Sequence, residues 1–189
     1  MADVWTDFNI THDPVSENTV NHQIRGLMQS PDKPHGGRAD SEPLTLDEYN
    51  ERHVNPDGSD RYNTHIDGFP SDGSVPGTTI TYHDTETFVR DYGTNLDRIG
   101  DDDGGYLALQ PDGVPASFEA RSLPIRTLVK PHASYEFTGH LPDDWKISIG
   151  ETAADFGRLG GSMQVRVIDN AGEIQTIDQL VPIGVLKQK

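Results

Sequence analysis

The sequence predicts a mostly-β domain of the α+β class with antiparallel strands, preceded by an extension of helices and loops. The chain holds 19 glycines and 13 prolines among its 189 residues, which is typical of short strands joined by many turns. From about residue 62 onwards, short β-prone runs alternate with turn dipeptides, without the strand–helix rhythm of a parallel sheet. We therefore divide the chain into an extension, residues 1–61, and a main domain, residues 62–189.

Two short helices are expected in the extension. Ser16 is placed to cap the first, and Thr45 with Glu48 forms the capping-box pattern that begins the second. The polar segment 30–42, rich in proline and glycine, predicts a loop between them. Neither helix carries enough apolar surface to fold alone, so we expect the extension to pack on the main domain or on a partner. The apolar positions are Val20, Ile24, Leu27 and Met28 in the first helix, and Leu46 and Tyr49 in the second.

The main domain shows four clear β-prone runs. They are rich in β-branched and aromatic residues, and glycine-containing turns separate them. The segment 169–172 predicts a turn after the last of these runs. The segment 174–185 fits a final strand or a short helix equally well. The four predicted strands are residues 78–83, 106–109, 134–138 and 163–168.

The charge of the chain limits its partners. The formal net charge is −16, which disfavours binding to nucleic acid or to an anionic membrane surface, and fits a soluble protein or one with a basic partner. Cysteine is absent, which excludes disulfides and a thiol nucleophile. No stretch reaches transmembrane length, and the N-terminal residues lack the pattern of a signal peptide. We expect any export signal to lie elsewhere in a longer polypeptide.

The sequence predicts no metal site and no cofactor motif. The acidic run 101–103 beside Gly104 and Gly105 lacks EF-hand spacing, so a solvated turn is the favoured interpretation. The histidines never fall in the spacing of a zinc enzyme, and the G-x-S-x-G motif of serine hydrolases is absent. The glycine-rich segment 157–161 does not fit the dinucleotide-binding pattern, although its last two glycines would allow close backbone approach to a ligand.

Two arginines and one glutamine are the candidate functional residues. Because the chain is so acidic, an anionic ligand could bind only where fixed cations reverse the local field, and arginine offers a planar fork to phosphate oxygens. Arg98 and Arg121 each lie near turn residues, where side chains can line a cleft. In the alternative interpretation each arginine forms a surface ion pair, with Asp97 and Glu119 as the available partners. Gln164 lies early in a predicted strand, and its amide can orient a sugar hydroxyl or a water.

These residues stand in short segments whose order and spacing resemble the NAD glycohydrolases of the tuberculosis necrotizing toxin (TNT) type. The resemblance runs from about residue 67 to residue 164, roughly half of the chain. The segments that carry it are Asp67-Gly68-Phe69-Pro70, Val75-Pro76-Gly77, Leu96-Asp97-Arg98-Ile99-Gly100, Gly104-Gly105-Tyr106-Leu107-Ala108, Phe118-Glu119-Ala120-Arg121-Ser122-Leu123-Pro124 and Gly160-Gly161-Ser162-Met163-Gln164.

The resemblance implies an enzyme that hydrolyses NAD⁺ to nicotinamide and ADP-ribose, with NAD⁺ or NADP⁺ as its substrate and no cofactor. It implies a β-rich toxin domain that is exported within a larger protein, depletes NAD⁺ and is blocked by a cognate immunity protein. By resemblance, Arg98 and Arg121 hold the phosphates, Tyr106 shapes the pocket, and Gln164 lies at the nicotinamide ribose. Gly160 and Gly161 are expected to approach the substrate through their backbone.

The chain departs from the family pattern at a histidine. The usual Pro-x-His-x-Tyr motif here reads Pro131-His132-Ala133-Ser134-Tyr135, a shift that on a strand would turn the histidine to the other face. We therefore assign no role to His132. Two further functions remain open: ADP-ribosyl transfer to an acceptor, and a non-catalytic NAD-binding module of the same fold.

Overall fold

The computed structural model describes residues 13–38, 41–62 and 72–189. The chain divides into two units, and each is built from three separate segments. We call the first the helical unit and the second the sheet unit. This division does not follow the boundary expected after residue 61, because two later segments pack with the N-terminal residues. The helical unit is drawn from 1–73, 117–129 and 153–161, and the sheet unit from 74–116, 130–152 and 162–189.

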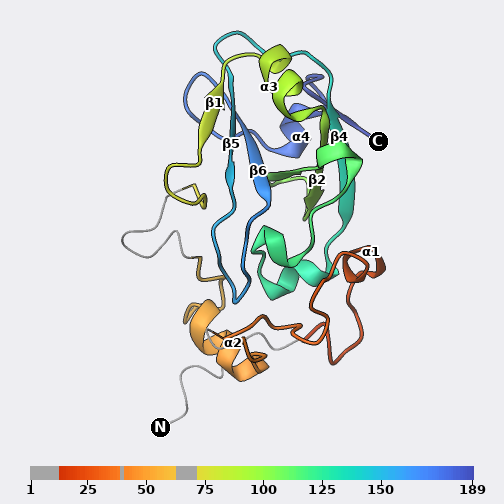
Figure 1. Cartoon of the computed structure of the whole chain (residues 1–189), viewed down its shortest axis with the longest axis vertical. Coiled ribbons are helices and arrows are strands. Elements are labelled where there is room, and N and C mark those ends of the chain that lie inside the picture. Colours follow the sequence, from red (N-terminus) through yellow and green to blue (C-terminus); the bar gives the residue numbers. More distant parts are fainter. Residues whose placement is uncertain (1–12, 39–40, 63–71) are drawn as a thin grey trace. The chain divides into compact units, whose positions relative to one another are not determined.

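The sheet unit contains one sheet of seven strands in the order β1-β5-β6-β3-β2-β4-β7 (Figure 1). Every neighbouring pair is antiparallel, which confirms the mostly-β, antiparallel class. The strands are β1 Ile80–Tyr82, β2 Asn95–Ile99, β3 Leu107–Leu109, β4 His132–Phe137, β5 Lys146–Glu151, β6 Met163–Ile168 and β7 Leu186–Gln188.

Two helices cover one face of this sheet. Helix α3 spans Thr85–Tyr92 and begins at Asp84, whose side chain accepts a hydrogen bond from the Thr87 amide. Helix α4 spans Ile177–Leu180. The segment 174–185, for which a strand or a short helix was expected, thus contains a short helix, and strand β7 follows it. Both helices contribute side chains to the hydrophobic core of the unit. The core includes Phe88, Leu96, Leu107, Leu109, Tyr135, Phe137, Ile147, Ile149, Val165, Val167, Ile177 and Leu180.

The opposite face of the sheet carries polar side chains. Directly opposed residues on neighbouring strands point to the same face, and adjacent residues alternate. Because Leu96 and Val165 lie in the core, their neighbours Asp97 and Gln164 face the other way. We call this the polar face. One row of cross-strand partners on it is Ser134, Asp97, Ala108, Gln164 and Gly150.

The helical unit holds α1, His22–Arg25, and α2, Leu46–His53. The predicted capping box at Thr45 is present, with both reciprocal hydrogen bonds to Glu48. The first helix is shorter than expected, because its cap is Asn21 and not Ser16. Asn18 has a φ of 58°, which interrupts any helix that would begin at Ser16.

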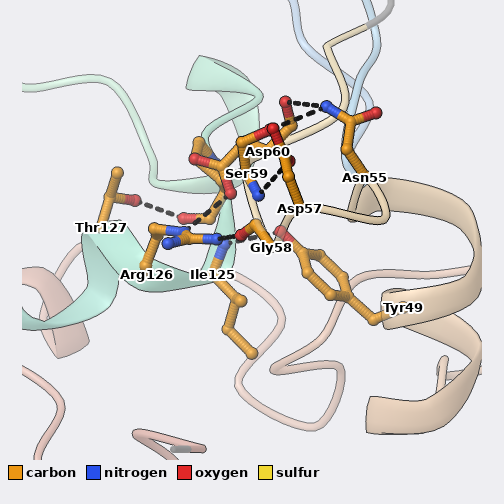
Figure 2. A network of polar contacts seen from close by, with 10 residues as sticks. Tyr49, Asn55, Asp57, Gly58, Ser59, Asp60, Ile125, Arg126 and Thr127 are labelled. Atoms are coloured by element: carbon orange, nitrogen blue, oxygen red, sulfur yellow. Dashed lines mark hydrogen bonds and ion pairs between the residues drawn. The ribbon is translucent and has the colours of Figure 1, made fainter. Parts of the chain in front are cut away.

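A polar network joins α2 to two later segments of the helical unit (Figure 2). The buried hydroxyl of Tyr49 accepts a hydrogen bond from the backbone amide of Ile125 at 2.9 Å. Arg126 forms an ion pair with Asp60 at 2.9 Å and also donates to the carbonyl of Gly58. The turn 55–60, acidic in sequence, is therefore neutralised in part by an arginine that lies more than 60 residues away along the chain.

Candidate functional site

Gln164 lies in strand β6 on the polar face of the sheet unit. Its Nε2 atom donates a hydrogen bond to Oγ of Ser74 at 2.8 Å. Ser74 is only 1% exposed, so the glutamine amide is held by a buried hydroxyl. The two residues are 90 positions apart, and sequence reasoning did not find Ser74. A glycine inside strand β5, Gly150, was the available signal, because glycine in a strand often marks close approach of another segment.

Arg98 supports the loop between β2 and β3. Its Nε donates to the carbonyl of Asp101 at 2.8 Å, and its Nη1 donates to the carbonyl of Tyr106 at 3.0 Å. A side chain at Gly104 would overlap with the guanidinium, so this glycine is needed for close packing. Burial lowers the pKa of Arg98, against the opposing effect of the nearby carboxylates, Asp103 first among them. The arginine therefore fixes the course of the loop that leads to Tyr106.

Tyr106 lies directly before β3 and is 41% exposed. The guanidinium of Arg166 lies 5.7 Å from the centre of its ring and donates to Oγ of Ser148 at 2.9 Å. Arg166 is two residues after Gln164 in β6, so Gln164, Arg166 and Tyr106 gather on the polar face. Strand alternation directs Arg98 to the opposite face from Gln164, although its guanidinium bonds the Tyr106 backbone.

His132 lies on the polar face together with Gln164, because it is two residues before Ser134, the partner of Asp97. This differs from the expectation that its one-residue shift turns it away. Its Nε2 lies 2.9 Å from Oδ2 of Asp97. Gln110 donates to the same oxygen at 2.9 Å and approaches Oγ of Ser134 at 3.3 Å. Asp97 is completely buried, so these donors compensate its lost hydration.

Arg121 belongs to the helical unit, at the end of the 3₁₀ segment η3, Glu119–Arg121, and it is buried. The carbonyl of Glu119 accepts a hydrogen bond from the amide of Gly160 at 3.3 Å. The Glu119 carboxylate accepts hydrogen bonds from the amides of Gln29 and Ser30 at 2.9 and 3.0 Å. Within this unit the structure thus brings the Arg121 segment next to the glycine pair Gly160–Gly161.

A tight turn precedes that glycine pair. Asp155 and Arg158 exchange backbone hydrogen bonds, and Phe156 and Gly157 between them have φ of 52° and 69°. Two positive φ values are typical of a type I′ turn, where phenylalanine is unusual. The Phe156 ring is completely buried, and it lies 5.5 Å from the ring of His53. Aromatic packing therefore holds the turn in a conformation that its backbone disfavours.

Arg158 is buried directly after this turn, with 4% exposure. Its Nη2 donates to the carbonyl of Pro34 at 2.8 Å, and its guanidinium lies 4.6 Å from the centre of the Phe118 ring. Its Nε and Nη1 atoms have no hydrogen-bond partner among the described residues. Burial lowers the pKa of Arg158. Sequence reasoning missed this residue, because a buried arginine has no distinguishing pattern.

The acidic run 101–103 is engaged by neighbouring side chains. Lys130 forms an ion pair with Asp101 at 2.6 Å, and the hydroxyl of Tyr135 donates to Asp102 at 3.3 Å. Within the described ranges, no group of three or more His, Asp or Glu side chains is placed to hold a metal ion. No helix in these ranges is long and apolar enough to cross a membrane. The segment 67–70, which contributes to the family resemblance, lies outside the described residues.

Comparison with known proteins identifies the family. The family model described as tuberculosis necrotizing toxin matches residues 91–189. Outer membrane channel protein CpnT from Mycobacterium tuberculosis, and from Mycobacterium bovis BCG, is 38% identical over 183 residues, which is 96% of this chain and 21% of each relative. The chain thus spans about a fifth of the curated relatives that it matches.

A solved structure shows the same fold. The tuberculosis necrotizing toxin complexed with its immunity factor IFT matches with a TM-score of 0.86 and 38% identity, over 95% of this chain and 89% of that one. The match extends to the N-terminal residues, beyond the range of the family model. The chain is therefore a toxin domain that belongs to the tuberculosis necrotizing toxin family.

Proposed function

We propose that this toxin domain is an NAD⁺ glycohydrolase, which cleaves the bond between ribose C1′ and nicotinamide. The observation that carries the proposal is the fixed amide of Gln164 on the polar face, at the position that the family resemblance assigns to the nicotinamide ribose. Family membership supports a toxin domain, for which depletion of NAD⁺ is the proposed activity.

The chemistry suits these residue types. Cleavage of a glycosidic bond passes through an oxocarbenium-like transition state, and nicotinamide leaves as a neutral molecule. No strong general acid is needed, so positioning of the sugar and stabilisation of developing charge are the main tasks. The amide of Gln164 donates and accepts hydrogen bonds, so it can orient the ribose or the attacking water.

Arg98 and Arg121 are proposed to bind the diphosphate. The formal net charge of −16 repels a dianion on average, so local cations are required. In the described part of the chain, Arg98 uses Nε and Nη1 for carbonyl oxygens, which leaves Nη2 to donate to a phosphate oxygen. Tyr106 is proposed to shape the pocket with its exposed ring, and Gly160 and Gly161 to approach the substrate through their backbone.

ADP-ribosyl transfer is the second candidate reaction, and one observation weighs against it. Transferases of this kind often carry a glutamate near the reacting ribose. Strand β5, which neighbours Gln164, contains one glutamate, Glu151. Glu151 pairs with Met163, and the adjacent Gly150 pairs with Gln164. Strand alternation therefore directs Glu151 away from the face that carries Gln164. Hydrolysis by water fits this arrangement better.

We further propose that the domain is delivered within a longer exported protein and that a cognate immunity protein inhibits it. The first part is supported by the relative CpnT, an outer membrane channel protein, because the chain matches only about a fifth of its length. The second is supported by the similar solved structure, in which tuberculosis necrotizing toxin is complexed with its immunity factor.

Product analysis tests the proposed reaction against its alternatives. The purified protein is incubated with NAD⁺, with and without acceptor proteins, and nicotinamide, ADP-ribose and modified acceptors are separated. Hydrolysis predicts free ADP-ribose in amounts equal to nicotinamide. ADP-ribose attached to acceptor proteins would indicate transfer, and intact NAD⁺ would indicate a binding module.

A further inference from the structure

We propose that Ser74 is a positioning residue for the reaction, which acts by fixing the orientation of the Gln164 amide. This inference rests on the proposed NAD⁺ glycohydrolase function, and it adds a residue that neither the sequence motifs nor the comparisons assign. The Ser74 Oγ accepts a hydrogen bond from Nε2 of Gln164 at 2.8 Å, on the polar face of the sheet. Ser74 is almost completely buried, so the hydroxyl end of this bond is shielded from competing water.

Hydrogen bonds hold the segment that carries Ser74 beside the C-terminal end of strand β5. Ser74 forms a β-bridge with Thr152, and the amide of Val75 donates to the carbonyl of Glu151 at 2.8 Å. The hydroxyl of Thr78 donates to the carbonyl of Val75 at 2.7 Å and accepts a hydrogen bond from the amide of Glu151 at 3.1 Å. These bonds fix the Ser74 backbone, so its hydroxyl can hold Gln164 in one place.

Gly150 gives independent evidence that the chain is built for this contact. It is the cross-strand partner of Gln164, and a Cβ at this position would lie 2.5 Å from Oγ of Ser74 and 3.1 Å from Oγ1 of Thr79. Its backbone does not adopt the positive φ that favours glycine. The glycine is therefore required by space alone, because any side chain there would displace the Ser74 hydroxyl.

The hydrogen bond holds the end of the Gln164 side chain in place. With Nε2 pointing at Ser74, the carbonyl oxygen Oε1 points away from that hydroxyl. Without this partner the Gln164 side chain could adopt other rotamers and move the amide away from its present position. Fixed orientation matters most in the transition state, where small errors in position reduce the rate. Loss of Ser74 should therefore lower kcat more than it raises KM for NAD⁺.

A double-mutant cycle tests this inference. We expect Ser74→Ala to lower kcat roughly tenfold to a hundredfold, by analogy with the loss of residues that orient the ligands of a metal site. In a Gln164→Ala background the same change should have almost no further effect, because the group that Ser74 positions is gone. Gly150→Ala should reproduce the Ser74→Ala defect. Thr85→Val is the matched control, since it removes a buried hydroxyl of helix α3 that bonds the carbonyl of Gly139.

The outcomes separate this inference from the proposed function. Ser74→Ala activity within twofold of the wild type would overturn the inference, as would an equal loss in the Gln164→Ala background. The NMR signal of the Gln164 side-chain amide provides a readout without activity: it should shift in Ser74→Ala and Gly150→Ala but not in Thr85→Val, and an unchanged signal would overturn the contact. A wild-type protein that leaves NAD⁺ intact would instead contradict the proposed function.

Discussion

Nε2 of His132 lies 2.9 Å from Oδ2 of Asp97, a carboxylate with no exposed surface. The same oxygen accepts a hydrogen bond from Gln110, so two donors stabilise one buried acceptor. His132→Ala would leave that acceptor with fewer partners. We expect it to lower the free energy of unfolding by about 1–3 kcal/mol, the cost of a buried polar group that loses its partner.

Urea unfolding at pH 7 measures this effect, with His140→Ala as the control because His140 is exposed. The control should change the free energy of unfolding by less than about 0.5 kcal/mol, as is usual for surface substitutions. Equal effects of the two variants would show that the contact between His132 and Asp97 contributes nothing to stability.

Substitutions of Arg98 and Arg121, the two residues proposed to bind the diphosphate, separate the effect of charge on NAD⁺ affinity from the effect of side-chain geometry. Arg98→Ala and Arg121→Ala should each weaken NAD⁺ binding by roughly 1.5–3 kcal/mol, the range of a charge-assisted hydrogen bond. Lysine should restore little affinity, because it lacks the planar fork. Calorimetry in a Gln164→Ala background measures affinity without turnover. The exposed Arg90, paired with Asp91, provides the control Arg90→Ala.

Unchanged affinity in both alanine variants would assign the two arginines a structural role. For Arg98 that role is already visible, since its guanidinium holds two carbonyl groups of the loop before β3. A loss of thermal stability in Arg98→Ala is therefore expected in addition to any loss of affinity.

Arg158 should tolerate an apolar replacement better than truncation. Two of its guanidinium nitrogens lack partners among the described residues, so the buried charge is poorly compensated. Arg158→Met keeps most of the side-chain volume without a charge, and we expect stability within about 1 kcal/mol of the wild type. Arg158→Ala should leave a cavity beside Phe118 and cost about 2–4 kcal/mol. Denaturant unfolding compares the two, and equal losses would show that the single hydrogen bond to Pro34 dominates.

His53 should make the stability of the helical unit depend on pH. Burial, followed by the charges of Arg52, Arg61 and Arg158, lowers the pKa of His53 to about 4. In the unfolded chain the imidazole takes up a proton near pH 6.5, whereas the folded chain resists it. The unfolded state therefore binds more protons between about pH 6.5 and pH 4, and stability falls as the pH drops through this window.

The variant His53→Phe tests that dependence, since it keeps an aromatic ring next to Phe156 without a titrating group. Melting temperatures from about pH 4 to about pH 7.5 should fall less steeply for the variant than for the wild type. Parallel curves for the two proteins would mean that His53 is protonated equally in the folded and unfolded states.

Local features were predictable from the sequence. Strand β6 has the predicted boundaries, the capping box at Thr45 is present, and the turn at 169–172 closes with a hydrogen bond from the Gly172 amide to the carbonyl of Asp169. Each of these depends on residues close together in the chain, where side-chain type and spacing decide the conformation.

Features that depend on distant partners were not predictable. Strand β2 was missed because Asp97 and Arg98 stand in its centre, and a buried aspartate does not fit an apolar alternation. The contact between Ser74 and Gln164 spans 90 residues. The candidate residues Arg98, Arg121 and Gln164 came from a family resemblance, which supplies positions but not the hydrogen bonds that each side chain makes.

Turnover of NAD⁺ by the wild type and by Gln164→Ala is the measurement that tests the central claim most directly. The wild type should release nicotinamide and ADP-ribose in equal amounts. The variant should be slower by at least about a hundredfold, as when one transition-state donor is removed. It should remain folded, because Gln164 lies outside the hydrophobic core and its replacement removes the side-chain hydrogen bond to Ser74. Intact NAD⁺ after incubation with the wild type, or near-normal turnover by a folded Gln164→Ala protein, would contradict the account.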